Sequence, residues 1–364
     1  WLQGKNINLS LSLEDYSDGV GGNAPVDNAD DFFSYLHLIL SRQNFSKSAF
    51  DKYIQRNLYV YENRATTGMA AVQDSIQQLL YPACAMNPRQ DEAFFKSVQY
   101  DKLEEQFQAH LGNASRFTYC LIGDIPEAKA KELILRYIGS LKGEGKPMKT
   151  AIQPMDFSSS TPVIKRTFET ETEGGMAEIE ISFANKLKLS DREQAALEVM
   201  RGILERRYFD VLREKEHLTY TVGVQSNYTS QPVAVESLNI HLSTARENAG
   251  KAVSLVYSIL DDVKAGRFTA DEFKAVMVPL AVDEEQTSAA SQANSDPSVW
   301  MALLNIYAET GNELSPNDNA ASAPIFKTLT AQDITAVAMK VMTNAKQREI
   351  IVKPAAQEGK HTFK

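Results

Sequence analysis

An internal repeat is the feature of this 364-residue sequence that most constrains its fold. Residues 45–52 and 268–275 each predict the capped start of a helix, with two phenylalanines in the same register. The other matched elements are helices 28–41 and 248–264, helices 103–110 and 333–342, and strands 117–123 and 349–352. Their common offset, on the order of 225 residues, predicts a duplicated domain and not a short solenoid repeat.

The second copy begins near Pro162 and is the more completely specified of the two. Its sequence predicts strands at 163–170 and 176–184, followed by a helix that starts at Ser190. Ser190 and Glu193 have the spacing of a capping box, which satisfies the free N–H groups of the first helical turn. The apolar positions of this helix fall on one face and are expected to be buried: Leu197, Met200, Ile203 and Leu204.

The first copy has no counterpart to these strands or to this helix. We therefore expect a first repeat domain at 1–145 that is truncated at its N-terminus, and a complete second domain at 160–355. Glycine, serine and proline gather at 142–147 and 158–162, as in an exposed linker. Apolar and polar residues alternate in further predicted strands at 7–13, 221–228 and 233–243. This pattern favours an α+β fold in which each domain has a mainly antiparallel sheet packed on one side by helices.

Composition excludes some classes of function. The net charge of −9 and the absence of any Lys/Arg run argue against a nucleic-acid-binding surface. No apolar stretch approaches the roughly 18 residues of a membrane span. An acidic protein of this kind suits several compartments. Its location stays open, with a periplasmic or secreted one slightly favoured.

The segment 212–220 carries the clearest candidate for chemistry. Arg213 closes an amphipathic helix and Tyr220 begins an alternating strand, so both side chains can point into one cleft. A guanidinium offers five donors in a fixed fork and a phenol offers one, a pair suited to holding a peptide carbonyl. The alternative is structural: a solvated arginine at a helix C-terminus beside a half-buried strand tyrosine.

A zinc site is not predicted within this chain. An inverted zincin helix requires His-x-x-Glu-His, which places two imidazoles on one helical face. Of the five histidines only His217 follows a glutamate, and the position three before Glu216 holds Arg213. Arginine cannot be deprotonated to coordinate a metal, so the match is a coincidence of spacing.

The segment resembles the arginine–tyrosine signature in the C-terminal half of pitrilysin/insulinase-type zinc metallopeptidases. The signature reads leucine–arginine, a few polar residues, leucine, a small residue and tyrosine. Here it matches at Leu212, Arg213, Leu218, Thr219 and Tyr220. Residues 120–124 and 137–141 are similar to the sequence pattern that ends a domain in this family. That pattern is an apolar strand, Gly, an acidic or polar residue, and a helix that ends in Tyr-x-Gly-Ser-Leu.

The resemblance implies that this chain is the non-zinc-binding half of an endopeptidase, forming one wall of a closed peptide-degrading chamber. It implies that Arg213 and Tyr220 orient the scissile peptide and steady its developing oxyanion. The N-terminal catalytic half, in the same chain or as a separate subunit, would carry the zinc and the general base. On its own this chain would be inactive. Two alternatives stay open: a non-catalytic scaffold or peptide-binding homologue of the same superfamily, and an unrelated α+β binding protein with a chance motif.

Overall fold

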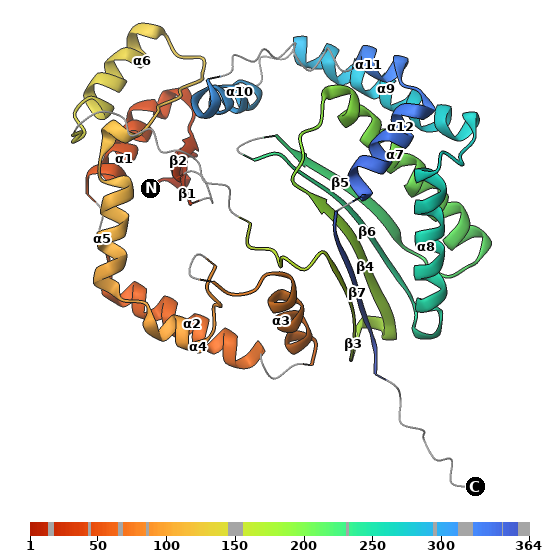
Figure 1. The fold of residues 1–364 in the computed structure, drawn as a ribbon. Helices are drawn as coiled ribbons and strands as arrows, with labels where there is room; N and C mark the ends of the chain where they lie inside the picture. The colour runs from red at the N-terminus through yellow and green to blue at the C-terminus, as the bar shows by residue number, and fades with distance from the viewer. Residues whose placement is uncertain are drawn as a thin grey trace. The chain divides into compact units, whose positions relative to one another are not determined.

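The computed structural model describes two compact units of one chain (Figure 1). Unit 1 comprises Trp1–Tyr61, Arg89–Gln153 and Ser295–Pro316, and unit 2 comprises Glu62–Pro88, Pro154–Asn294 and Asn317–Lys364. The described residues are 1–13, 18–42, 45–64, 68–84, 87–144, 156–230, 233–293, 297–311, 323–343 and 345–355. Each unit is built from stretches that are separated in sequence. The domain division predicted between residues 145 and 160 stays a prediction.

Unit 1 contains a two-stranded antiparallel sheet of β1 (Asn8–Leu13) and β2 (Asp18–Asn23). Its helices are α1 (Ala29–Ser41), α2 (Lys47–Arg64, which continues into unit 2), α4 (Glu92–Ser97), α5 (Tyr100–Leu111), α6 (Glu127–Leu133) and α10 (Pro297–Thr310). Ser46 Oγ accepts a hydrogen bond from Ala49 N at 3.2 Å, which confirms the predicted cap of α2. The helix predicted at 103–110 is confirmed within α5.

The predicted strand at 117–123 is wrong, because residues 117–122 have no strand structure. A strand needs a partner for its backbone groups, and within the described part of unit 1 only β1 and β2 pair with each other. The structure does not show the predicted duplication. Unit 1 has this two-stranded sheet, whereas unit 2 has a five-stranded one.

Unit 2 is organised by a mixed sheet of strand order β3-β7-β4-β6-β5. The strands are β3 (Val163–Thr170), β4 (Met176–Asn185), β5 (Val222–Thr229), β6 (Val235–Ala245) and β7 (Lys346–Pro354). β3 and β7 are parallel and the other neighbours are antiparallel. The expectation of a mainly antiparallel sheet therefore holds, with one parallel pair that was not predicted.

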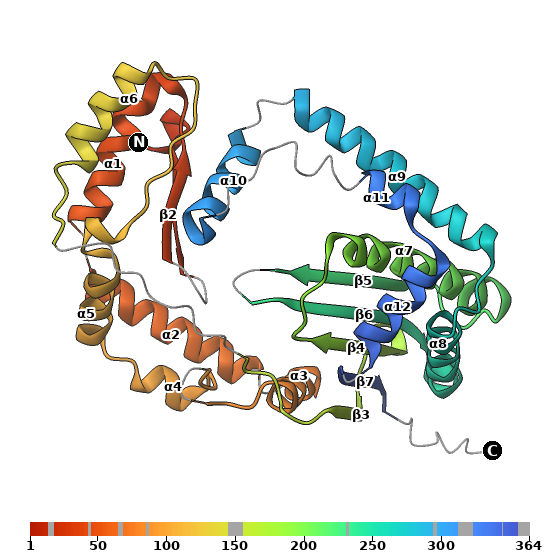
Figure 2. The same ribbon diagram turned by 45° about the horizontal axis from the view of Figure 1, so that its top comes forward.

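Helices cover one face of this sheet and form the main core (Figures 1 and 2). They are α7 (Asp191–Tyr208), α8 (Ala249–Lys264), α9 (Ala270–Ala293), α11 (Ala323–Thr328) and α12 (Ala331–Met342). The predicted stripe of α7 is confirmed, since Leu197, Met200, Ile203 and Leu204 are all buried. The predicted capping box is confirmed as well, with Ser190 and Glu193 bonded reciprocally.

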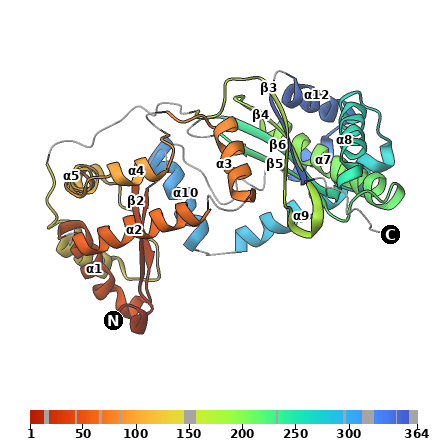
Figure 3. The ribbon, with the colours of Figure 1, turned by 90° about the horizontal axis from the view of Figure 1, so that it is seen from below.

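A helix also packs on the opposite face, so the expectation of helices on one side needs correction. Helix α3 (Gly68–Leu80) lies against β3 and β7 (Figure 3). The buried strand residues there are Ile164, Ile350 and Val352. The physical reason lies in β7, where Ile350 and Val352 face α3 while Ile351 between them packs on the main core. A strand with apolar residues on both faces must be covered on both.

Candidate functional site

The connection from α7 to β5 positions both predicted site residues. Helix α7 ends at Tyr208 and the chain continues as a π-helical turn over Phe209–Lys215. Leu212 is fully buried, and its carbonyl accepts a hydrogen bond from Leu218 N at 2.8 Å. His217 has a left-handed backbone, with φ of 50°, which turns the chain toward the sheet. Such π-helical turns are frequent at functional sites because they reorient side chains within a helix.

Arg213 lies on the π-helical turn with its side chain about half exposed. Its guanidinium stands over the ring of Phe209, 4.7 Å from the ring centroid. Its Nε atom lies 3.4 Å from a carboxylate oxygen of Glu214. The guanidinium thus makes a cation–π contact with an aromatic ring, which uses none of its N–H donors.

Tyr220 presents its side chain to solvent from a firmly held backbone. Its side chain is 82% exposed, whereas the preceding residue, Thr219, is 4% exposed. The Thr219 hydroxyl lies 2.6 Å from the Ser243 carbonyl oxygen and 2.7 Å from the Thr221 carbonyl oxygen. Thr244 Oγ1 donates to the Leu218 carbonyl at 2.6 Å. Strand β6 therefore fixes the chain on the N-terminal side of an aromatic side chain that makes no hydrogen bond within the described part of the protein.

A second anchor ties the connection to helix α8. Lys251 Nζ donates to Glu216 Oε2 at 2.7 Å, and this ammonium group lowers the pKa of the Glu216 carboxyl. The ring Nδ1 of His217 lies 3.1 Å from the Arg213 carbonyl oxygen. His217 is thereby involved in closing the helix end. Arg213 and Tyr220 belong to one short, anchored connection, but the structure gives no contact between them within the described residues.

The described residues do not fit a metal ion. Within the described ranges, no group of three or more His, Cys, Asp or Glu side chains is placed to hold one. The same ranges contain no helix that combines the length and apolarity that crossing a bilayer requires.

Sequence reasoning missed a buried carboxyl group, that of Glu236. It is fully buried on β6, and its Oε2 accepts a hydrogen bond from Asn185 Nδ2 at 3.0 Å. Burial raises the pKa of this carboxyl to about 7, against the smaller lowering by Asn185. The signal was present in the alternation of β6. Glu236 has the same parity as the inward-facing Leu238 and Ile240.

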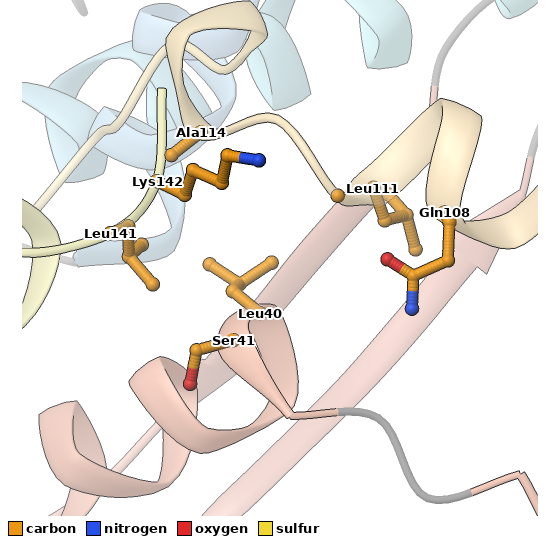
Figure 4. Close-up of a pocket in the computed structure, with 8 residues that line it drawn as sticks. Leu40, Ser41, Gln108, Leu111, Ala114, Leu141 and Lys142 are labelled. Atoms are coloured by element: carbon orange, nitrogen blue, oxygen red, sulfur yellow. The ribbon is translucent and has the colours of Figure 1, made fainter. Parts of the chain in front are cut away.

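A small pocket lies in unit 1 (Figure 4). Its volume is about 220 Å³. The ends of α1 and α5 and the segment at Leu141 and Lys142 line it, and its apolar walls include Leu40 and Leu111. Arg213 and Tyr220 do not contribute to it.

Comparisons with known proteins identify the fold. Residues 97–277 match the family described as peptidase M16 inactive domain. The ferredoxin protease FusC, crystallised with Arabidopsis ferredoxin, is structurally similar with a TM-score of 0.77 and 14% identity over 97% of this chain and 37% of FusC. The periplasmic protease PqqL from Escherichia coli gives a TM-score of 0.74 and 12% identity over 98% of this chain and 38% of PqqL.

A shorter solved structure is covered more completely. The peptidase M16 inactive domain from Pseudomonas fluorescens gives a TM-score of 0.69 and 16% identity over 97% of this chain and 82% of that one. This chain thus spans less than two fifths of FusC and of PqqL. No curated protein matches the sequence. The chain therefore carries a peptidase M16 inactive domain, matched at residues 97–277, and nearly the whole chain shares the fold of M16 proteases.

Proposed function

We propose that this chain is the substrate-anchoring, non-zinc-binding half of a zinc-dependent endopeptidase. It forms one wall of a closed chamber, and Arg213 and Tyr220 contact the peptide substrate. The observation that carries this proposal is the presentation of Tyr220, a large aromatic residue left 82% exposed directly after the buried and hydrogen-bonded Thr219. Large aromatic side chains normally contribute buried area, so the exposure of this one directly after a buried, hydrogen-bonded residue supports a contact with a ligand.

The chemistry of the pair supports a role at the scissile bond. The Arg213 guanidinium and the Tyr220 hydroxyl can both donate hydrogen bonds to a carbonyl oxygen that gains negative charge during hydrolysis. Donors fixed in advance stabilise that charge without reorganisation. Phe209 lies under the guanidinium, and the bond from Thr244 Oγ1 to the Leu218 carbonyl holds the chain just before Tyr220, which supports a site that is partly ordered before substrate arrives.

The metal and the general base would come from an N-terminal catalytic half, in the same chain or as a separate subunit. Among the residues that the structure describes, no group of His, Cys, Asp or Glu side chains fits a zinc ion. PqqL is by its name a periplasmic protease and FusC a ferredoxin protease. These names favour a peptide substrate and a periplasmic or secreted location for this protein too. A duplicated domain within this chain remains part of the proposed architecture.

The test is peptidase activity of the protein containing both halves, with Arg213→Ala and Tyr220→Phe beside the wild type. Removing one oxyanion donor is expected to lower kcat/KM about tenfold or more while the fold is kept. Lys215→Ala, on the same turn, and Tyr53→Phe, an exposed tyrosine of α2, are matched controls. Full activity in both site variants would refute the assignment.

A second candidate is a non-catalytic scaffold or peptide-binding homologue. The description of the matched family as an inactive domain favours it. Peptide binding that depends on Tyr220 in an assembly without any peptidase activity would support this candidate over the first.

A further inference from the structure

The two edges of the unit 2 sheet differ in how they are protected. β3 forms one edge and carries the charged residues Lys165, Arg166 and Glu169. β5 forms the other edge, and its sequence from Val222 to Thr229 contains no charged residue and no proline. All eight residues pair with β6 in unbroken register, so no bulge interrupts the strand. Proteins usually guard exposed edges with charges, prolines or bulges, and β5 has none of these.

The register identifies which backbone groups of β5 face outward. Ser243 N donates to the Thr221 carbonyl, so residues 221 and 243 form a hydrogen-bonded pair. In an antiparallel ladder such pairs alternate with pairs that make no hydrogen bonds to each other. The N–H and C=O groups of Val222, Val224, Ser226 and Tyr228 therefore point away from β6. Within the described part of the chain β6 is the strand paired with β5, and no other strand uses this row.

The outward row is rigid because its side chains are anchored beneath α7. Val224 is buried. Ser226 Oγ donates to Glu198 Oε1 at 2.7 Å, and the Tyr228 hydroxyl accepts from Leu189 N at 3.0 Å. An added strand would therefore meet donors and acceptors that are already ordered, which lowers the entropic cost of binding.

We propose that the free edge of β5 binds an extended segment of the peptide substrate as an added strand. This inference rests on the proposed function, because the edge begins two residues after Tyr220 and so continues the site that we assign to the scissile region. Backbone hydrogen bonds recognise any extended peptide, whereas side chains on the strand select among them. Gln225, Asn227 and Thr229 are the exposed residues of β5 and none is charged, so a segment of uncharged polar and apolar residues fits best.

A matched pair of variants at Ser226 tests the backbone contact. Ser226→Pro removes an outward N–H without removing a bond to β6, a position at which edge strands tolerate proline. Ser226→Ala loses the same hydrogen bond to Glu198 but keeps the N–H group. The probe is a capped, fluorescently labelled peptide of about ten residues that alternates valine and glutamine. Fluorescence anisotropy of the whole chain with this probe gives the affinity, and circular dichroism checks that each variant is folded.

The proposal requires that wild type and Ser226→Ala bind the probe equally and that Ser226→Pro binds about tenfold more weakly. Equal binding by Ser226→Pro and Ser226→Ala would overturn it, as would the absence of binding to wild type at about 1 mM probe. If Ser226→Pro does not fold, N-methylated probes decide the matter. A probe methylated at every residue must lose binding, whereas one methylated at alternate residues keeps one free edge and must retain it.

Two further measurements separate this inference from the proposed function and from self-association. If Tyr220→Phe and Arg213→Ala lower activity while the Ser226 pair binds alike, the proposed function stands and the β5 inference fails. If Ser226→Pro weakens probe binding while Tyr220→Phe and Arg213→Ala leave peptidase activity unchanged, the inference stands and the assignment of the two donors fails. Sedimentation of the chain with and without probe shows whether a second copy occupies the edge. A stable dimer that excludes the probe would overturn the peptide proposal.

Discussion

The buried carboxyl group of Glu236 should make the stability of this protein fall as pH rises. The side chain is fully buried, and Oε1 has no hydrogen-bond partner within the described residues. Its single donor, Asn185 Nδ2, also donates to the Val341 carbonyl near the end of α12, at 2.6 Å. A negative charge at this position would lose its hydration and lie beside the negative end of a helix.

The size and sign of the effect follow from the pKa. Burial raises the pKa of Glu236 from 4.5 to about 7, so the folded state holds this proton more tightly than the unfolded state. Stability from this group is therefore fully present below about pH 4.5 and is lost as pH rises toward 7. The difference of roughly 2.5 units corresponds to about 3 kcal/mol of unfolding free energy, as an upper value.

Urea unfolding of the wild type and of Glu236→Gln at about pH 5 and about pH 8 measures this effect. The glutamine keeps the shape of the side chain but cannot ionise. The free energy of unfolding of Glu236→Gln minus that of wild type should therefore rise by up to about 3 kcal/mol from pH 5 to pH 8. Glu180→Gln, an exposed glutamate on β4, is the control. A constant difference between wild type and Glu236→Gln at both pH values would refute the reasoning.

Two further predictions concern stability. Arg207 holds Glu272 through two hydrogen bonds of 2.7 and 3.1 Å and lowers its pKa to about 2, so the stabilisation is present above about pH 4.5 and lost as pH falls through 2. Glu272→Gln should lower the free energy of unfolding by about 1 kcal/mol at neutral pH, a value that allows for solvent screening. An unchanged urea midpoint would contradict this prediction. Thr219→Val should lower the free energy of unfolding by about 1–3 kcal/mol, because the Ser243 carbonyl loses its donor. Thr219→Ser retains the hydroxyl and should retain this hydrogen bond. Equal thermal midpoints for Thr219→Val and wild type would argue against that role.

Locally encoded features were the ones predictable from sequence. The capping box at Ser190 and Glu193 and the apolar stripe of α7 depend on residues within a few turns, and both are confirmed. Strand β3 was predicted with its observed bounds, Val163–Thr170, and its β-branched and aromatic residues favour a strand locally. Caps and periodicity are properties of short segments, so one sequence contains the information needed.

Features that depend on distant partners were not predictable. Residues 117–122 have strand-like composition but no strand to pair with, and the parallel partner of β3 is more than a hundred residues away in β7. The burial of Glu236 depends on α12 and on Asn185 of a neighbouring strand. For the candidate site, the sequence indicated Arg213 and Tyr220. The exposure of Tyr220 and the hydrogen bonds of Thr219 required the structure.

Strand β6 connects the buried carboxyl group to the proposed substrate site, which raises the question of whether pH acts on both. Glu236 and Thr244 are eight residues apart on this strand, so about 27 Å separates them. That is several times the Debye length of about 8 Å at physiological salt, so the charge itself cannot act on Tyr220. The same distance does not apply to the β5 edge, because Glu236 is paired with Tyr228 there. As long as the protein is folded, Glu236→Gln should therefore leave the contribution of Tyr220 to kcat/KM, measured as the ratio between wild type and Tyr220→Phe at about pH 8, unchanged. A several-fold change in that ratio would show that ionisation displaces β6 as a whole, because this strand holds the backbone before Tyr220.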